Sequence, residues 1–484
     1  SNNYRKNNFM MNQFTIPKAI IGLWQIADME RSGNKVDPAN AAKSMMQYYE
    51  NGFTCFDMAD HYGSSEEIAG YCKKHFAPAG IQFFTKWVPS PGVITEKIAE
   101  EAVERALKRL DSPQIDLLQF HAWNYADPNW LNALYALNKL REKGFIANIG
   151  LTNFDHIHLN MVIASGIPVV SNQIAYSLLD QRGSHAMAAT CLQHNVQLLA
   201  YGTVAGGFFS EKWLGKEEPI LSESLTWSQM KYKRFIDAAG GWSWFQSLLS
   251  TLSSIATSNK VSIATVASAY MAQAPAVGAV IIGSRLGASE HIEENKKILT
   301  LQLKESDKTA IESILSKANK IAGNCGDEYR KPPFLTASGD LSHHIKEFPK
   351  PYETKVSEDG SIRVFSGTPW EPLAGYARAV KKGNQIFVSG TTATHGHTII
   401  GGIDPAAQTH FVIDKIEGAL HSLDAKLEDV VRTKVFINNI EQWEAIARAH
   451  GERFAHIQPA NTMVEAKLIG NGYLVEIEVD AIVN

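Results

Sequence analysis

Four side chains that can move or place a proton follow successive apolar runs in the first quarter of the chain. Asp57 and Tyr62 follow the first of these runs, Lys86 ends the second and His121 ends the third. A phenol has a pKa of about 10 and donates its proton readily only when a neighbouring ammonium stabilises the phenolate. With Lys86 as that ammonium and Asp57 as its counter-ion, Tyr62 could protonate a carbonyl oxygen as hydride reaches the carbon. His121 would then be the hydrogen-bonding partner that positions the carbonyl.

Two further polar residues, Asp60 and His61, lie inside the same stretch, FDMADHYGSSE. Burying polar groups without partners is costly, so the stretch is either a solvated turn or a site of chemistry. We expect Asp60 and His61 to be polar loop residues and not catalysts.

Eight short, β-rich apolar runs alternate with longer segments of helical periodicity. The runs span residues 19–24, 53–58, 81–87, 115–121, 146–152, 169–176, 196–202 and 279–284. This alternation favours a (β/α)8 TIM barrel over an open doubly wound sheet. The first loop also lacks the G-x-G-x-x-G fingerprint of a Rossmann domain. Functional side chains of a barrel gather at the carboxyl ends of its strands, where the four candidate residues lie.

The segment that begins near Thr95 illustrates the helical periodicity. Ile98, Ala102, Ala106 and Leu110 are spaced four residues apart, with charged residues between them. This pattern predicts an amphipathic helix, and Thr95 is a suitable N-cap.

A long insertion, residues 203–260, separates the last two strands and is rich in aromatic residues. Long loops on the catalytic face of a barrel often act as lids. These aromatic residues either cover a pocket or simply pack the insertion onto the barrel.

The chain divides into four segments. Residues 1–14 form an Asn-rich tail that we expect to be disordered, and 15–322 form the barrel. A stretch rich in Pro, Gly and charge, 323–357, predicts a linker. Residues 358–484 predict a smaller α+β domain with helices on one sheet.

Composition excludes several classes of partner. Lys and Arg number 46 against 50 Asp and Glu, a formal charge of −4, so no global field favours nucleic acid or an anionic membrane. The four cysteines are scattered and no Cys/His spacing fits zinc, so we expect reduced thiols and no metal site. No apolar run approaches a transmembrane length and the start lacks an apolar signal segment. These features predict a cytoplasmic protein with small-molecule partners.

The first domain resembles the aldo-keto reductases. The resemblance rests on FDMADHYG, FFTKW and LLQFHAW, which occur in this order at the ends of successive strands. It implies an NADP-dependent oxidoreductase that reduces an aldehyde or ketone. It implies Tyr62 as general acid, Lys86 and Asp57 as the pair that tunes it, and His121 as the residue that orients the substrate.

The cofactor motifs are also similar to those of the family. The resemblance implies that three segments contact nicotinamide: GLTNF, SNQIAYS and the end of the run at 196–202. It implies that IIGSRLGASEHIEEN binds the adenosine-phosphate end of the cofactor. The implied cofactor residues are Thr152, Asn153, Gln173, Tyr201, Gly283, Ser284, Arg285, Glu294 and Asn295. The nicotinamide supplies the hydride chemistry.

The choice between NADPH and NADH depends on the adenosine end. Many NADPH-specific members have an arginine where this chain has His291. Arg285 could still clamp a 2′-phosphate, because guanidinium binds phosphate bidentately. We therefore favour NADPH, with NADH possible.

Three aromatic residues near the strand ends are expected to line the substrate pocket. They are Trp24, Trp123 and Tyr125. Packing at the rim of the barrel is the alternative for each.

The second domain resembles the Rid/YjgF family through YARAVKKGNQIFVSG, VVRTKVFINN and PANTMVEAKLIGNGYLVEIE. That family implies a homotrimer with clefts between subunits, and its best-studied members hydrolyse enamines and imines. Its deaminating members have an arginine after Pro-Ala, where this chain has Asn461; Glu476 matches the family's acidic residue. Asn cannot form a charged bidentate pair with a carboxylate. The difference favours a changed ligand or a structural role.

The sequence thus predicts a carbonyl reductase fused to a Rid-like domain that trimerises it or binds a small ligand. The first alternative is a cofactor-binding sensor with little turnover. The second is a bifunctional reductase and imine or enamine deaminase. An intact Asp, Tyr, Lys and His set favours the reductase.

Overall fold

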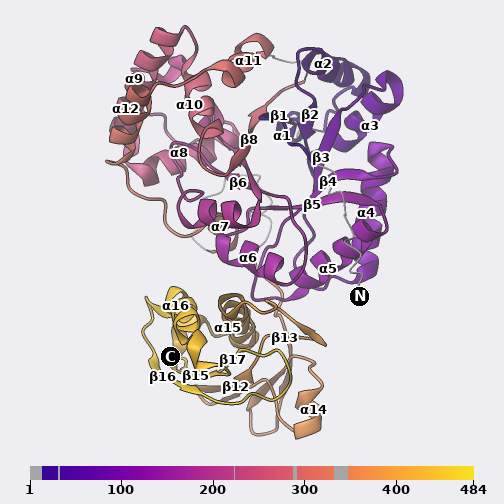
Figure 1. Ribbon diagram of the computed structural model, residues 1–484, viewed down its shortest axis with the longest axis vertical. Coiled ribbons are helices and arrows are strands. Elements are labelled where there is room, and N and C mark those ends of the chain that lie inside the picture. Colours follow the sequence, from indigo (N-terminus) through magenta and orange to yellow (C-terminus); the bar gives the residue numbers. More distant parts are fainter. Residues whose placement is uncertain (1–13, 31–32, 223, 287–290, 332–346) are drawn as a thin grey trace, which may run out of the picture.

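The computed structural model describes residues 14–30, 33–222, 224–286, 291–331 and 347–484. Its first domain is a closed barrel of eight parallel strands in the order β1 to β8 (Figure 1). The strands are β1 (Ala19–Gly22), β2 (Cys55–Asp57), β3 (Gln82–Trp87), β4 (Ile115–Phe120), β5 (Ile146–Thr152), β6 (Ser171–Ala175), β7 (Gln197–Tyr201) and β8 (Val277–Gly283). Pairing of Ala19 with Val280 closes the barrel. The predicted (β/α)8 fold is confirmed.

The barrel interior is packed with side chains and is not a pore. Strands alternate their side chains between two faces, so one residue in two points inward. A compact interior cluster of fully buried residues comes from six strands: Ile20, Cys55, Phe84, Leu117, Leu199 and Ala279. The opposite faces of the strands pack under the helices in a separate, larger cluster. This layering fixes where each strand end projects its functional side chain.

Helices surround the barrel (Figure 1). They are α1 (Trp24–Glu30), α2 (Pro38–Glu50), α3 (Ser65–Phe76), α4 (Glu96–Leu110), α5 (Asn129–Glu142), α6 (His156–Ala164), α7 (Ala186–His194), α10 (Ile263–Ala272), α11 (Ile292–Thr300) and α12 (Glu305–Leu315). In α4, Thr95 is the N-cap as predicted and accepts from Ile98 N at 3.2 Å. Ala102, Ala106 and Leu110 are buried, whereas Ile98 is exposed.

The insertion between β7 and β8 begins with two short 3-10 turns, Ala205–Gly207 and Glu211–Trp213. Two α-helices follow them, α8 (Trp227–Ala239) and α9 (Gly241–Asn259). Its aromatic residues pack on one another. Phe208 is fully buried and its ring centroid is 4.9 Å from that of Trp213, and Phe209 packs on Phe245 at 5.5 Å. These rings pack the parts of the insertion against one another.

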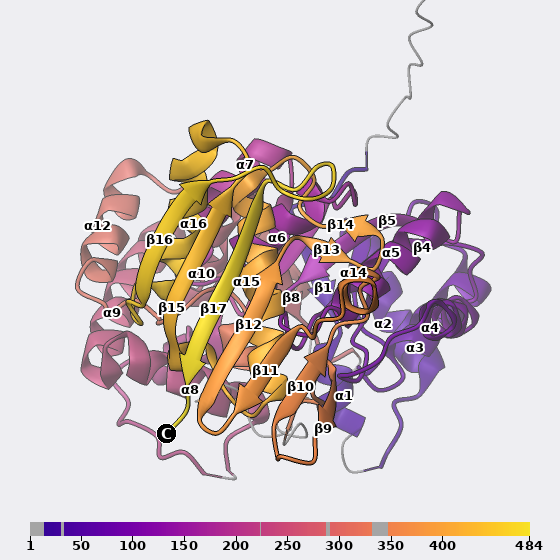
Figure 2. The ribbon, with the colours of Figure 1, turned by 90° about the horizontal axis from the view of Figure 1, so that it is seen from below.

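The second domain is a seven-stranded sheet in the order β16-β15-β17-β12-β11-β10-β9. Its strands are β9 (Glu353–Val356), β10 (Ile362–Phe365), β11 (Ala379–Lys382), β12 (Gln385–Thr391), β15 (Val430–Ile437), β16 (Ala460–Glu465) and β17 (Val475–Ile482), with a small hairpin of β13 (Thr394–His395) and β14 (Thr398–Ile399). Helices α15 (Pro405–Ser422) and α16 (Trp443–Phe454) lie behind the sheet in Figure 2, and α14 (Trp370–Ala374) lies at its edge. The predicted α+β domain is confirmed.

Both ends of the predicted linker, 323–357, are structured. Residues 327–330 form a short helix, α13 (Asp327–Arg330), that is buried against the barrel, and β9 joins the second sheet. Although this stretch is rich in charge, Glu328 is buried and pairs with Arg182 at 2.6 Å. Residues 332–346 lie outside the described part of the chain.

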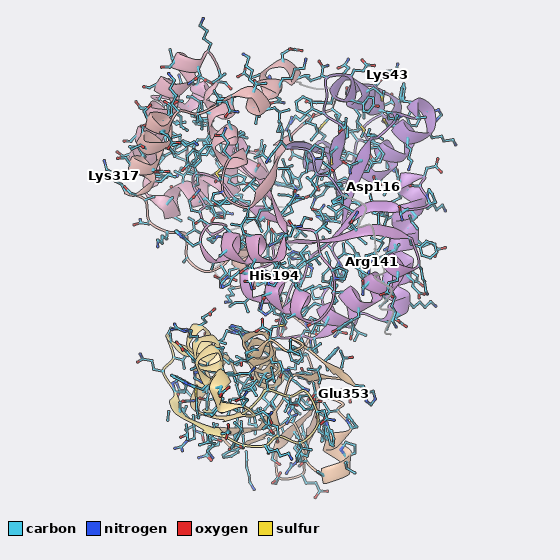
Figure 3. All side chains as sticks on the ribbon, viewed as in Figure 1. Lys43, Asp116, Arg141, His194, Lys317 and Glu353 are labelled. Atoms are coloured by element: carbon cyan, nitrogen blue, oxygen red, sulfur yellow. The ribbon has the colours of Figure 1, made fainter. Side chains whose placement is uncertain are left out.

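The two domains meet where α6 of the barrel packs on α15 (Figure 1). Asn160 donates to Asp404 Oδ2 at 2.9 Å, and His194, labelled in Figure 3, contacts the Asn160 side-chain oxygen at 3.1 Å. Gly402 lets the backbones approach closely, because a Cβ there would lie 2.3 Å from the Ala164 carbonyl oxygen. The two domains are therefore closely packed against one another at this contact.

Candidate active site

Lys86 and Asp57 form a buried ion pair at the carboxyl ends of β3 and β2. The Lys86 ammonium donates to Asp57 Oδ2 at 2.6 Å and to the Met58 carbonyl oxygen at 3.0 Å. The Lys86 side chain is 4% exposed and that of Asp57 is 3% exposed. Burial alone would lower the pKa of Lys86, but Asp57 and Tyr62 outweigh burial and raise it. Lys86 is therefore held as a cation at neutral pH.

Tyr62 lies beside this cation in the turn that follows β2. Lys86 Nζ is 4.7 Å from the centroid of the Tyr62 ring, and a hydrogen bond between the two side chains contributes to the raised pKa of Lys86. The turn is anchored from α1, because the Glu30 carboxylate accepts from Ser64 N at 2.7 Å. Gly63 has φ 53°, and a Cβ there would lie 2.2 Å from Glu30 Oε1. Glycine is thus required where the turn brings the phenol to Lys86.

Two amides hold the other side of the Asp57 carboxylate. Gln119 Nε2 donates to Asp57 Oδ1 at 2.9 Å and Gln173 Nε2 donates to the same oxygen at 2.8 Å. Gln173 Nε2 also donates to Gln119 Oε1 at 2.8 Å. These bonds fix the carboxylate that holds Lys86. Gln119 was not among the predicted site residues, although a polar residue inside the buried run IDLLQF was a signal for it.

His121 follows β4 and completes the set. It is 3% exposed and packs edge-on against Trp123 and Tyr329, with ring centroids 4.3 and 5.6 Å away. Burial, reinforced by Arg330 and His61, holds the pKa of His121 well below its usual range, so the ring is neutral at pH 7. Its Nε2 is buried and has no hydrogen-bond partner among the residues that the structure describes. A carbonyl or alcohol oxygen would supply that partner.

The other polar residues of the opening motif lie in its loop. Asp60 Oδ1 is 2.8 Å from His61 Nδ1, and Asp60 Oδ2 accepts from Val88 N at 3.1 Å. Both side chains are partly exposed, 24% for Asp60 and 32% for His61. They hold the loop against the end of β3.

Helix α13 brings a tyrosine to the mouth of the barrel that the sequence analysis missed. The Tyr329 hydroxyl accepts from the Lys231 ammonium at 2.8 Å and lies 3.3 Å from the Tyr201 hydroxyl. Lys231 comes from α8 and is 7% exposed. Tyr329 also packs against His121, so the segment after the barrel forms one wall of the site. The four-residue helix has no amphipathic period by which it could have been found.

A buried ion-pair cluster anchors α13. Arg182 donates to Glu328 Oε2 at 2.6 Å and to Asp180 Oδ2 at 2.7 Å. Burial would raise the pKa of Glu328, but Arg182 outweighs burial and lowers it. Because all three side chains are buried and paired, removal of one would leave an uncompensated buried charge.

Comparison with known proteins identifies both domains. Residues 18–316, more than half of the chain, match the profile of the Aldo/keto reductase family. The chain belongs to the aldo/keto reductase family. Membership implies an oxidoreductase that acts on carbonyl groups and uses a nicotinamide cofactor. Residues 368–483 of this aldo/keto reductase match a second profile, described as Endoribonuclease L-PSP, which covers the Rid/YjgF proteins. The predicted fusion is confirmed.

Individual relatives match one domain or the other. An uncharacterised protein of Streptomyces coelicolor is 37% identical over 127 residues, 26% of this chain and 95% of the relative. Flagellar radial spoke protein 5 of Chlamydomonas reinhardtii is 25% identical over 251 residues, 43% of this chain and 47% of the relative. The chain thus spans about half of that relative. A glycerol dehydrogenase structure from Gluconobacter oxydans shares the fold at 20% identity, with TM-score 0.53 over 63% of this chain and 94% of its own.

The predicted nicotinamide-binding residues of this aldo/keto reductase lie together at the ends of β5, β6 and β7. Tyr201 donates to Asn153 Oδ1 at 2.6 Å, and Asn153 Nδ2 lies 3.5 Å from His121 Nδ1. Thr152 Oγ1 donates to the Gln173 carbonyl oxygen at 3.3 Å. These amide and hydroxyl groups lie next to His121, on its Nδ1 side, and their chemistry fits the carboxamide and ring of a nicotinamide.

The predicted adenosine-end residues lie at the end of β8 and after it. Ser284 is 4% exposed and its hydroxyl has no partner among the described residues, while Arg285 pairs with Asp28 at 3.0 Å. Burial would raise the pKa of Glu294, but hydrogen bonds led by Lys297 lower it to about 2. A hydroxyl and a guanidinium are both groups that can bind a phosphate.

Two more residues of this end differ in their surroundings. Gly283 is exposed, and an added Cβ there would have only the Gln25 side chain within 4 Å. Asn295 lies in α11, where its backbone N–H donates to the His291 carbonyl oxygen at 2.8 Å. Residues 287–290 between them are outside the described part of the chain.

The predicted pocket aromatics occupy three different environments. Trp24 begins α1 and is partly buried. Trp123 packs on His121 and donates from Nε1 to the Pro89 carbonyl oxygen at 3.0 Å. Tyr125 stacks on His158, with centroids 3.5 Å apart and planes at 5°. Trp123 thus lies against His121, whereas Tyr125 lies against His158.

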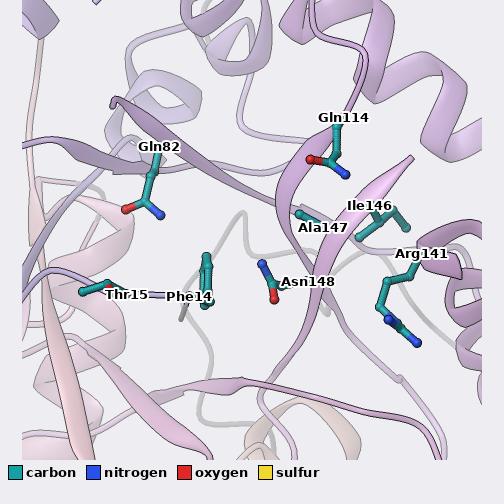
Figure 4. Close-up of a pocket in the computed structure, with 8 residues that line it drawn as sticks. All are labelled: Phe14, Thr15, Gln82, Gln114, Arg141, Ile146, Ala147 and Asn148. Atoms are coloured by element: carbon teal, nitrogen blue, oxygen red, sulfur yellow. The ribbon is translucent and has the colours of Figure 1, made fainter. Parts of the chain in front are cut away.

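Cavity size does not mark the end of the barrel at which the predicted site residues lie. A cavity of about 550 Å³ lies at the opposite end of the barrel, lined by residues that include Phe14, Gln82, Arg141 and Asn148 (Figure 4). A smaller cavity of about 30 Å³ is lined by residues that include His121 and others from the loops after β3 and β4. The chemistry of the side chains and not the volume therefore identifies the site.

The two predicted residues of the Rid-like site lie on different faces of the sheet. Asn461 pairs with Thr433 and donates to Thr433 Oγ1 at 2.9 Å, whereas Glu476 pairs with Phe436. Because Thr433 and Phe436 are three residues apart on one strand, their partners face opposite sides. Burial raises the pKa of Glu476, which Arg378 partly opposes. One copy of the chain therefore does not bring Asn461 and Glu476 together.

Within the ranges that the structure describes, no group of three or more His, Cys, Asp and Glu side chains could hold a metal ion. None of the described helices is both long and apolar enough to cross a membrane.

Proposed function

We propose that this aldo/keto reductase reduces an aldehyde or ketone with NADPH and that Tyr62 supplies the proton. The observation that supports this most directly is the Lys86 cation, which is buried, paired with Asp57 and hydrogen-bonded to Tyr62. A cation beside a phenol stabilises the phenolate that remains after the proton has left. The same arrangement would be an unneeded cost in a protein that only binds a cofactor, since buried charges are expensive.

His121 would orient the carbonyl. Its ring is neutral, and its buried Nε2 lacks a partner in the described structure. A neutral imidazole can hydrogen-bond the carbonyl oxygen without competing with Tyr62 as the acid. Trp123 and Tyr329 flank the ring and exclude water from it. The substrate oxygen would therefore lie between the His121 nitrogen and the Tyr62 hydroxyl.

Nicotinamide, when bound, supplies the hydride. Asn153, Thr152 and Gln173 would hold its carboxamide and Tyr201 would contact its ring. We favour NADPH over NADH because the adenosine end carries the Arg285 guanidinium and the Ser284 hydroxyl, which has no partner among the residues that the structure describes.

A turnover assay tests this proposal. The full chain is mixed with NADPH or NADH and a panel of aldehydes and ketones, and cofactor oxidation is followed by absorbance. We expect turnover on at least one carbonyl, with a higher kcat/KM for NADPH. Tight cofactor binding without oxidation on any substrate would instead support a sensor.

We also propose that the Rid-like domain assembles the chain into a homotrimer. Its sheet has helices on one face, and the other face carries apolar side chains: Phe387 is 48% exposed, Val464 44% and Ile482 42%. Salt bridges on the same face, such as Lys434 to Glu478 at 3.1 Å, surround them. An uncovered sheet face of this kind is typical of an interface.

Light scattering tests the assembly. Phe387→Asp should reduce the mass from three chains to one, because a carboxylate would be buried in the interface. Leu192→Asp is the matched control, since Leu192 is 64% exposed on α7 of the barrel and is not part of this sheet. A Phe387→Asp protein with unchanged mass would remove the sheet face as the assembly surface.

A further inference from the structure

A histidine at the junction of the two domains is held by a carboxylate from each. His158 lies in the first turn of α6; its Nδ1 is 2.7 Å from Asp155 Oδ1 and its Nε2 is 2.7 Å from Asp414 Oδ2. The three side chains are 2% to 7% exposed. A neutral imidazole carries one N–H, so the ring can donate to both carboxylates only as a cation. A buried cation of the barrel is thus paired with an anion of the Rid-like domain.

The Asp414 carboxylate is itself fixed from α16. Arg453 donates to Asp414 Oδ1 at 2.7 Å and to Glu417 Oε2 at 3.2 Å. Asp414 therefore bridges two cations, one in each domain, and its position is set by the fold of the Rid-like domain.

The His158 ring supports the loop that carries the carbonyl-orienting histidine. Tyr125 stacks on it, with centroids 3.5 Å apart. Arg330 of α13 lies over the same Tyr125 ring, 4.3 Å from its centroid, and donates from Nε to the Ala122 carbonyl oxygen at 2.8 Å. Ala122 is the neighbour of His121. The chain of contacts therefore runs from the Rid-like domain to the residue beside His121.

Helix α15 also touches this loop directly. A Cβ at Gly418 would lie 2.3 Å from the Ala126 carbonyl oxygen, so the helix backbone presses against the loop one turn after Asp414. The loop 121–126 is thus held by α15, by the ring of His158 and by Arg330. Two of these three supports depend on the Rid-like domain.

We propose that Asp414 is a positioning residue for the reductase: it holds the His158 ring, which fixes Tyr125 and thereby the loop that presents His121 to the carbonyl. The inference rests on the proposed carbonyl reduction. The Rid-like domain is then an integral part of the reductase site as well as its assembly module. An orientation error of about 1 Å can cost on the order of 100-fold in rate, so a remote support of this kind matters.

The charge on His158 gives the coupling a pH signature. Burial would lower the pKa of His158, but Asp155 and Asp414 outweigh burial and raise it to about 9. The raised pKa contributes stability that is complete below the ordinary pKa and is lost as pH rises through about 9. The groups that face His158 from the surrounding elements are Asp155, Asp414, Tyr125, Arg330, Arg453 and His410.

The test compares Asp414→Asn with Asp404→Asn in the full chain. Asp404 also bonds across the interface, to Asn160, but does not contact His158, and asparagine keeps its N-cap role. We expect Asp414→Asn to lower kcat/KM for the carbonyl about 10- to 100-fold, with NADPH affinity unchanged, and to move the alkaline loss of activity to lower pH. Asp404→Asn should leave both kcat/KM and the pH of the alkaline loss of activity unchanged.

Hydrogen exchange provides a readout that does not need turnover. Backbone amides of residues 121–126 and 327–330 should exchange faster in Asp414→Asn than in Asp404→Asn. If the wild type reduces no carbonyl but exchange is still faster in Asp414→Asn than in Asp404→Asn, the proposed reductase is overturned. The coupling of the two domains would then still hold. An active wild type whose Asp414→Asn variant keeps its kinetics, pH profile and exchange would overturn this inference and leave the reductase intact.

A second variant covers the case in which Asp414→Asn does not fold. Tyr125→Leu removes the stacked ring and leaves the His158 ion pairs in place. It should lower kcat/KM and speed exchange of residues 121–126 in the same way. A Tyr125→Leu protein with wild-type values of both would equally overturn the inference.

Discussion

Tyr62→Phe is expected to lower kcat for carbonyl reduction about 10²- to 10⁴-fold, the range lost when a general acid is removed. The ring remains and only the hydroxyl that hydrogen-bonds Lys86 is deleted, so cofactor affinity should not change. Stopped-flow oxidation of NADPH gives the rate, and fluorescence titration gives the affinity.

The control for this variant is Tyr49→Phe. Tyr49 of α2 donates its hydroxyl to the carbonyl oxygen of Ala79, in the loop between α3 and β3, at the end of the barrel opposite to the carboxyl ends of the strands. Its kcat should equal that of the wild type. Equal rates for Tyr62→Phe and Tyr49→Phe would remove Tyr62 from the mechanism.

Lys86→Met is expected to abolish turnover and to destabilise the fold by about 3–5 kcal/mol, the usual cost of breaking a buried ion pair from one side. The reason is that Asp57 would remain buried with only the two amides of Gln119 and Gln173 as donors. Activity falls because nothing then stabilises the Tyr62 phenolate. Urea unfolding measures the stability and NADPH oxidation measures the rate.

The double variant Asp57→Asn with Lys86→Met separates the two effects. It removes both buried charges, so much of the lost stability should return while activity stays absent. A Lys86→Met protein with wild-type turnover would contradict the assigned role of the cation. So would a double variant that regains activity together with stability.

The sequence was sufficient for the barrel because each strand is a short apolar run with a polar group at its carboxyl end. Parallel strands of a barrel present these ends at one face. Asp57, Lys86 and His121 could therefore be grouped without coordinates, and the structure does place Asp57 against Lys86. The second domain was equally accessible, since its helices and strands follow the two usual periods.

Contacts between segments distant in sequence could not be predicted from periodicity. Tyr329 lies in a four-residue helix within a stretch whose Pro, Gly and charge content predicted a linker. Its burial depends on Arg182, which is far away in sequence and donates to the Glu328 carboxylate. His158 gives no signal either, because its two carboxylate partners come from different domains. The opposite orientation of Asn461 and Glu476 likewise depends on register.

Transfer of deuterium from NADPH labelled at both C4 hydrogens tests the central claim most directly. The full-length wild type is incubated with the labelled cofactor and the carbonyl compound of the panel that it turns over, or with the whole panel. The account predicts one deuterium on the alcohol carbon for each cofactor oxidised, with the rate lost in Tyr62→Phe. Tight cofactor binding with no label in any alcohol would contradict it.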